Sequence, residues 1–225
     1  MFNFIGIAQI DSAAGNFEYN AKKIIEYIKI SQESNAEIVV FPQNALCGNL
    51  LENVFLRHPY LKQECEKWLN GIAKSTQNIT VIMGYFNNST AIIKNGVVVK
   101  IIEEYPCVYE NICVTNSLKS KKSELIINLK QTMNKDVLSL QNSLPYQANE
   151  YKTPIIYVNS VGATDNMSYI GSSCAYNQDG QLIARAKSFE EELLIVNLSK
   201  SNEINSLTVC DKKQDEFSLD YEADL

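Results

Sequence analysis

The sequence predicts an α/β fold. Three apolar runs, at residues 4–10, 37–41 and 79–85, have the length and composition of buried strands. Between them lie residues 15–34 and 58–75, in which apolar side chains recur at helical spacing. Strands that alternate with helices in this way indicate a sheet whose faces are covered by helices.

The two predicted helices have recognisable beginnings. Asn16 precedes the first helix and is a suitable N-cap, because its side chain can accept a hydrogen bond from a free backbone N–H. Pro59 stands in the first turn of the second helix, where its missing N–H is not needed.

The second half of the chain predicts further strands and one polar helix. Residues 90–102 predict a hairpin, because Asn95-Gly96 between two apolar runs is the preferred pair for a type I′ turn. Residues 103–123 show no clear period. Strands are expected at 124–129, 153–162 and 190–198, and a second hairpin over 168–186 that turns at 177–180. The polar segment between 130 and 152 is expected to be mostly helical and interrupted at Pro145.

Length, composition and charge limit the number of domains and the kinds of partner that we expect. The chain has 225 residues, 45% of them apolar, with a net charge of -6. This suits one large domain, which we place at residues 1–198, followed by a polar, acidic tail at 199–225.

The densest basic stretch, at 119–122, is too short to predict a nucleic-acid partner, and no apolar stretch approaches the length of a membrane span. The N-terminus lacks a basic segment before its apolar run, so we expect a cytoplasmic protein.

Histidine and cysteine usage predicts neither a metal site nor a cofactor. His58 is the only histidine, and it precedes a proline at a helix start, which argues against a Ser-His-Asp site and against zinc. The six cysteines form no CxxC pair, so we expect reduced thiols that are mostly in the core.

The segment EIVVFPQNALCGN, residues 37–49, raises the question of function. Its apolar run ends at Pro42, and Gln43 follows where the chain leaves the strand. A strand end is a common place for a catalytic group, but a carboxamide cannot take up a proton.

The order of several motifs resembles the carbon-nitrogen hydrolase (nitrilase) superfamily, with the closest likeness to the glutaminase domain of glutamine-dependent NAD synthetases. The segments that carry the resemblance are IGIAQIDSAAGNFEYNAKKI, AEIVVFPQNALCGN, NGVVVKI, SELIINL and the region TPIIYVNSVG through FEEELLIVNL. The resemblance implies a shortened αββα sandwich that pairs as a homodimer. It also implies amide hydrolysis by a thiolate nucleophile, a glutamate base and a lysine that stabilises the oxyanion.

The implied triad is degenerate in this sequence. Gln43 stands where the resemblance expects the glutamate, and neither Glu37 nor Glu52 has that position. Glu103-Glu104 stand where the lysine is expected, and Lys100 comes too early. The resemblance expects the cysteine after a strand, followed by Glu-Asp. Cys113 is instead followed by Val-Thr, and Cys107 is a weaker candidate. Gln43 and Cys113 are therefore vestigial candidates only.

Two functional hypotheses remain open. The first is a catalytically impaired binding or partner subunit that pairs with itself, with a separate NAD synthetase or with a paralogous nitrilase subunit. The second is an active amidohydrolase with a displaced cysteine site, using Cys113 or Cys107 as the thiolate. A fast-alkylating cysteine would favour the second.

Overall fold

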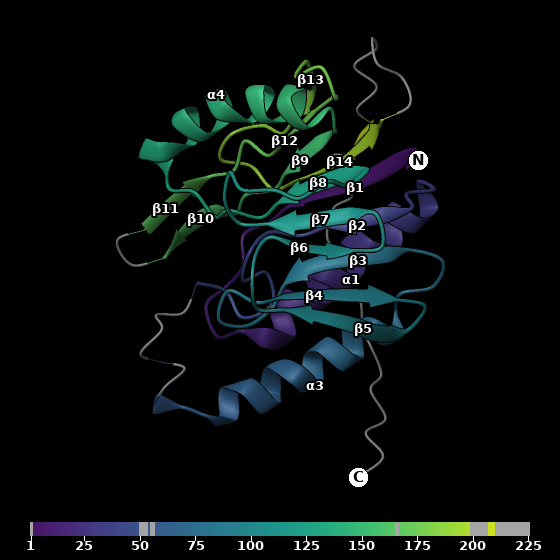
Figure 1. The fold of residues 1–225 in the computed structure, drawn as a ribbon. Coiled ribbons are helices and arrows are strands. Elements are labelled where there is room, and N and C mark those ends of the chain that lie inside the picture. The colour runs from purple at the N-terminus through teal and green to yellow at the C-terminus, as the bar shows by residue number, and fades with distance from the viewer. Residues whose placement is uncertain (1, 50–53, 55–56, 165–166, 199–206, 210–225) are drawn as a thin grey trace.

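The computed structural model describes residues 2–49, 54, 57–164, 167–198 and 207–209. Two mixed sheets lie face to face, with α1 and α3 on one side and α4 on the other (Figure 1). The shortened αββα sandwich that the resemblance implies is confirmed.

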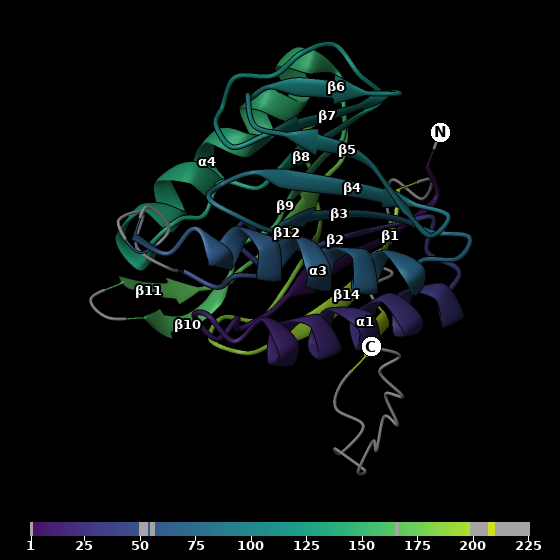
Figure 2. The ribbon, with the colours of Figure 1, turned by 90° about the horizontal axis from the view of Figure 1, so that it is seen from below.

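The first sheet has the strand order β15-β14-β1-β2-β3-β4-β5, and β1, β2 and β3 run parallel. α1 and α3 lie along its outer face (Figure 2). Asn16 caps α1 as predicted, accepting a hydrogen bond from the Tyr19 N–H at 3.2 Å. The elements of this half are β1 (Phe4–Gln9), α1 (Phe17–Glu33), β2 (Ile38–Val40), α3 (Tyr60–Lys74), β3 (Thr80–Gly84), β4 (Thr90–Lys94), β5 (Val97–Ile102), β14 (Glu192–Asn197) and β15 (Leu207–Val209).

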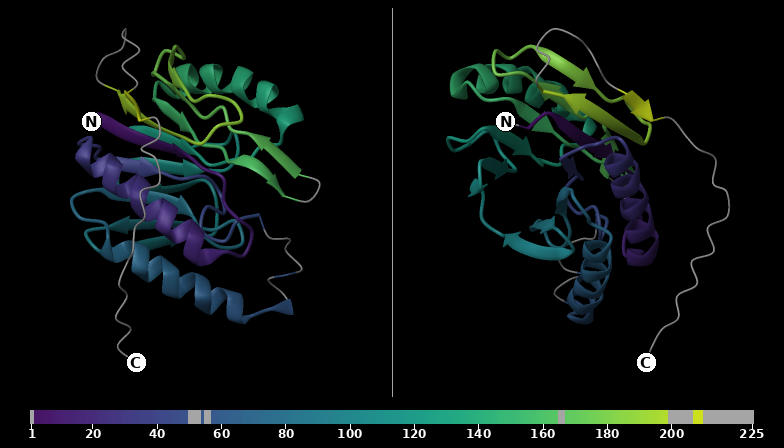
Figure 3. Two further views of the ribbon diagram at one scale, coloured as in Figure 1. Left: turned by 180° about the vertical axis from the view of Figure 1, so that it is seen from behind. Right: turned by 90° about the vertical axis from the view of Figure 1, so that its right-hand side faces the viewer.

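The second sheet has the strand order β13-β12-β9-β8-β7-β6, with β7, β8 and β9 parallel. α4 covers its outer face, and a separate hairpin, β10 with β11, lies at one end (Figure 3). The elements of this half are β6 (Cys107–Tyr109), β7 (Ile112–Thr115), β8 (Leu125–Asn128), α4 (Asn134–Tyr151), β9 (Ile155–Tyr157), β10 (Val161–Thr164), β11 (Met167–Ile170), β12 (Cys174–Tyr176) and β13 (Leu182–Arg185).

Alternate side chains of the buried strands pack against different layers. In β2, Ile38 and Val40 face the second sheet, while Val39 faces the helices. In β9, Ile156 faces the first sheet, while Ile155 and Tyr157 face α4. Every residue of both strands is buried, which confirms that their continuous apolar sequences need cover on both faces.

The hairpin of β4 and β5 turns as predicted. Asn95 has φ 51° and Gly96 has φ 84°, and two positive φ values in succession define a type I′ turn. Glycine and asparagine adopt this region at little steric cost, so the dipeptide sets the register of the two strands.

The expected interruption at Pro145 is wrong, because α4 runs unbroken from Asn134 to Tyr151. Proline removes the N–H that would bond to the carbonyl four residues earlier, which belongs to Gln141. The Tyr176 hydroxyl of β12 donates a hydrogen bond to this carbonyl at 3.4 Å. A tertiary contact therefore replaces the lost helical bond.

Four further regions differ from the sequence prediction. Residues 103–123, which have no clear period, hold the hairpin of β6 and β7. The strand expected at 153–162 is divided into β9 and β10, and the hairpin expected at 168–186 is divided into β11 and the pair β12–β13. Within the tail at 199–225, the described residues 207–209 form β15 beside β14.

Candidate functional site

The carboxyl ends of the parallel strands of both sheets meet at one edge of the sandwich. The backbone N–H of Val161, after β9, bonds to the carbonyl of Ile10, after β1, at 3.2 Å. Gln131, after β8, donates to Asn49 Oδ1 at 2.6 Å and to Ser160 Oγ at 3.1 Å. Gln43 follows β2, another parallel strand, so it lies toward the same edge.

Gln43 is buried just after β2, and its amide forms a hydrogen bond with a second loop. Nε2 donates to the backbone carbonyl of Asn88, in the connection between β3 and β4. Oε1 is buried and has no hydrogen-bond partner among the described residues. Asn44 reinforces the same contact, since its Oδ1 accepts from the Asn88 N–H at 3.1 Å. The side chain at the expected base position therefore joins two loops.

Tyr105 belongs to this cluster, although the sequence analysis did not identify it. Its hydroxyl donates to the Asn88 carbonyl at 3.0 Å and accepts from Thr90 Oγ1 at 2.6 Å. Burial raises the pKa of Tyr105, and the hydrogen bond with Thr90 opposes this rise. A neutral phenol thus lies beside Gln43, and it shares the carbonyl that the glutamine uses.

The position expected for a lysine is acidic. Glu103 and Glu104 follow β5 directly, and both are exposed. Lys100 lies within β5, opposite Ile92, and is half-buried. Neither carboxylate can donate a hydrogen bond to a developing oxyanion.

Cys113 lies inside β7, opposite Ile126, and Thr115 is the residue that ends the strand. The thiol is fully buried among residues that face α4, including Leu144. It accepts hydrogen bonds from Ser120 Oγ at 3.5 Å and from the Lys121 N–H at 3.4 Å. The structure therefore places Cys113 on the helix-covered face of the second sheet, and it does not bring Cys113 together with Gln43.

The remaining candidates also lie apart from Gln43. Cys107 is half-buried on β6 and packs against the core between the sheets. The Glu37 carboxylate accepts a hydrogen bond from the Asn3 N–H at 2.9 Å. Glu52 lies outside the described residues. His58 is exposed and packs edge-on against Tyr60, with 5.6 Å between the ring centroids.

Two motifs that carry the resemblance have structural roles that the sequence analysis did not foresee. Gln9 accepts hydrogen bonds from the N–H and Oγ of Ser173, both at 2.9 Å, and donates to the carbonyls of Lys187 and Glu190. A Cβ at Gly171, which has φ 73°, would lie 2.3 Å from the Gln9 amide. Gly171 and Ser173, which lie in the last segment that carries the resemblance, thus pack against the buried Gln9 amide and donate hydrogen bonds to it, respectively.

Asn20, in the first segment that carries the resemblance, IGIAQIDSAAGNFEYNAKKI, has a similar role. Its Oδ1 accepts from the Ala13 N–H, and its Nδ2 donates to the carbonyls of Ala13 and Leu46. One fully buried amide thus fixes the loop before α1 and the loop after β2. These contacts give the residues of this segment a structural role in the scaffold.

The model of the carbon-nitrogen hydrolase family matches residues 4–103 and 105–204. The chain belongs to the carbon-nitrogen hydrolase family. It is 26% identical over 246 residues to the glutamine-dependent NAD(+) synthetase of Thermotoga maritima, covering 86% of this chain and 42% of that protein. It is 28% identical over 249 residues to the synthetase of Aquifex aeolicus, covering 85% of this chain and 41% of that protein.

Solved structures show the same fold. The glutamine-dependent NAD+ synthetase from Acinetobacter baumannii superposes with a TM-score of 0.74 at 21% identity, covering 87% of this chain and 45% of that one. An amidase from Nesterenkonia sp. gives a TM-score of 0.75 at 15% identity, covering 88% and 90% of the two chains. The resemblance to the synthetases is confirmed, and the chain spans less than half the length of the synthetases named here.

Among the described residues there is neither a membrane-spanning helix nor a metal-binding cluster. Within the described ranges, no helix combines the length and apolar character that a membrane crossing requires. Among the same residues, no group of three or more His, Cys, Asp or Glu side chains is arranged to hold a metal ion.

Proposed function

We propose that this carbon-nitrogen hydrolase-fold protein is catalytically impaired and acts as a binding or partner subunit linked to NAD synthesis. The observation that carries the proposal is the use of the Gln43 amide. Its Nε2 donates to a backbone carbonyl in the position where the resemblance implies a proton acceptor. An amide has no basic oxygen, so it cannot activate a thiol or a water molecule.

The other two positions support the same proposal. Exposed carboxylates at Glu103 and Glu104 replace the implied oxyanion donor, and Cys113 faces α4 from inside a strand. Loss of a general base alone lowers catalytic rates by about 10²–10⁴. Loss of a nucleophile that works as part of a unit has cost about 10⁶ in a serine protease. These effects are not additive, but either one would bring a slow amidase close to the uncatalysed rate.

The names of the relatives suggest the context of the binding role. The relatives named above are glutamine-dependent NAD(+) synthetases, of which this chain matches less than half. We therefore propose a homodimer in the cytoplasm, or a complex with a separate synthetase or a paralogous nitrilase subunit. Light scattering of the purified chain, alone and with such a partner, tests this assembly against a monomer.

The competing function is an active amidohydrolase that uses Cys113 or Cys107, and thiol alkylation separates the two. A catalytic thiolate reacts fast because its pKa is low. Cys113 is instead fully buried and Cys107 is half-buried, so an alkylating reagent has restricted access to both thiols. We expect iodoacetamide to modify Cys113 and Cys107 more slowly than free cysteine at pH 7, as followed by peptide mass spectrometry. A rate tenfold above that of free cysteine at either position, levelling off below pH 7, would support the active enzyme.

A further inference from the structure

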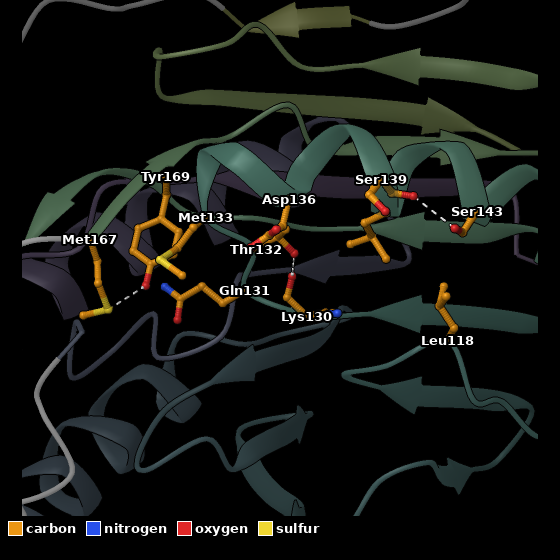
Figure 4. A pocket seen from close by; sticks show the side chains of 11 residues that line it. Leu118, Lys130, Gln131, Thr132, Met133, Asp136, Ser139, Ser143, Met167 and Tyr169 are labelled. Atoms are coloured by element: carbon orange, nitrogen blue, oxygen red, sulfur yellow. Dashed lines mark hydrogen bonds between the residues drawn. The ribbon is translucent and has the colours of Figure 1, made fainter.

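A pocket of about 360 Å³ lies where the β8–α4 connection, the first turns of α4 and β11 meet (Figure 4). Neither Gln43, Glu103 nor Cys113 lines it. Its volume is within the range of small-molecule sites. The pocket is therefore a candidate binding site that is separate from the positions of the implied triad.

One end of the pocket is apolar and polarisable. Met133, Met167 and Tyr169 gather there, and Leu118 and Ser143 lie toward the opposite end (Figure 4). The Tyr169 hydroxyl donates to Met167 Sδ at 3.4 Å, which holds both side chains in place. Thioethers make favourable contacts with aromatic rings and adapt to irregular apolar groups. This end suits an aromatic or apolar side chain.

Two opposite charges lie between these ends. Lys130 and Asp136 both line the pocket, and among the described residues neither takes part in an ion pair. Their backbones are fixed, since the Lys130 N–H bonds to Asn128 Oδ1 at 2.9 Å and the Asp136 N–H bonds to the Met133 carbonyl at 3.0 Å. Both side chains are exposed, so water solvates either charge when it is unpaired, and a ligand with one charge pairs with only one of them. A zwitterion satisfies both.

We propose that this pocket binds a free α-amino acid with an apolar or aromatic side chain. The ligand carboxylate pairs with Lys130, the ligand ammonium pairs with Asp136, and the side chain packs on Met133, Met167 and Tyr169. A glutamine side chain would lose the hydration of its amide against these thioethers, so glutamine is a poor ligand for this site.

Titration calorimetry with L-phenylalanine as the probe tests the proposal. We expect saturable binding with a dissociation constant on the order of 1 mM, because both ion pairs are solvent-accessible. Lys130→Gln and Asp136→Asn should each weaken binding about fivefold. The matched control Lys67→Gln changes an exposed lysine on α3, against the other sheet, and should leave binding unchanged.

Two derivatives of L-phenylalanine, each lacking one of its charges, test which ligand charge pairs with Lys130 and which pairs with Asp136. L-phenylalaninamide, which lacks the carboxylate, should bind weakly to the wild-type protein and be insensitive to Lys130→Gln. N-acetyl-L-phenylalanine should be insensitive to Asp136→Asn for the same reason. L-glutamine should bind more weakly than L-phenylalanine. The proposal is overturned if L-phenylalanine shows no saturable binding, or if neither pocket substitution weakens it. Neither result depends on whether the chain hydrolyses an amide.

Discussion

Gln9 shows how much one polar side chain contributes to this fold. It is fully buried, and its amide joins the end of β1 to Ser173 and to the loop before β14. Burying an amide lowers stability unless its oxygen and its nitrogen both form hydrogen bonds. Both atoms of the Gln9 amide do so. The residue therefore fixes one end of the first sheet against the segment before β12.

Gln9→Ala should lower the free energy of unfolding by about 2–4 kcal/mol, because it leaves buried partners unpaired and opens a cavity. Urea unfolding of the variant and the wild-type protein measures this difference. Gln63→Ala removes an exposed glutamine from α3 and should change stability by less than about 0.5 kcal/mol. Equal effects of the two substitutions would show that the Gln9 contacts do not stabilise the fold.

Gln43→Glu should be destabilising at neutral pH. The new carboxylate would replace the Nε2 donor and face the Asn88 carbonyl, another acceptor. We expect a loss of about 1–3 kcal/mol in the free energy of unfolding at pH 7.

The loss should depend on pH with a defined sign. The buried carboxyl would have a raised pKa in the folded state, while a glutamate in the unfolded chain has a pKa of about 4.3. Above pH 4.3 the folded state then binds more protons than the unfolded state, so the penalty grows as pH rises through the folded pKa. Below pH 4.3 the penalty should disappear. Urea unfolding at pH 4 and pH 7 checks this, with Gln63→Glu as an exposed control, and a pH-independent difference between variant and wild type would contradict it.

At the scale of the elements, α4 depends on its neighbour β12. Pro145 leaves the Gln141 carbonyl without its helical donor, and Tyr176 supplies one. Tyr176 is buried, and burial raises its pKa to about 12, so it remains a donor at neutral pH.

Tyr176→Phe should lower the free energy of unfolding by about 1 kcal/mol in the wild-type background, because the carbonyl becomes unsatisfied. In a Pro145→Ala background the helix regains its own N–H donor, so the same substitution should have a smaller effect. A double-mutant cycle by chemical unfolding measures this coupling. Equal effects in the two backgrounds would mean that the Tyr176 hydroxyl does not compensate for the proline.

The elements that were predicted from sequence are those with strong local patterns. α1, α3, β2 and the β4–β5 hairpin have helical spacing, continuous apolar runs or an Asn-Gly turn. β6 and β7 were missed because their strands are short and their flanking residues have no period. The path of α4 through Pro145 could not be predicted, since its compensating donor comes from a distant strand. Local patterns do not contain such tertiary contacts.

The candidate site could be predicted only in part, because local sequence patterns show some of its residues and tertiary contacts determine the others. The departure at Gln43 can be read directly from the sequence, because it follows a strand and a proline. The role of Tyr105 could not, because it depends on a contact with the distant Asn88, and the orientation of Cys113 could not, because it depends on how β7 pairs with β6 and β8. A pocket lined by residues of several elements is likewise visible only in the folded chain.

At the scale of the whole molecule, the sandwich places Gln43 and Cys113, the two positions that the resemblance singles out, in different layers. Gln43 lies at the end of the first sheet and bonds to a loop, while Cys113 lies on the outer face of the second sheet beneath α4. Restoring one group should therefore not restore a reaction. The central claim is that this scaffold, intact in its motifs, has no hydrolytic centre at the implied positions.

Ammonia release from glutamine tests that claim most directly. The assay compares the wild-type protein, Gln43→Glu and the double variant Gln43→Glu with Cys113→Ala, each confirmed as folded by circular dichroism at the assay pH. We predict the uncatalysed rate for all three, because a base without an oxyanion donor or an aligned thiolate accelerates little. Release above that rate by the wild-type protein, or by Gln43→Glu but not by the double variant, would contradict the account.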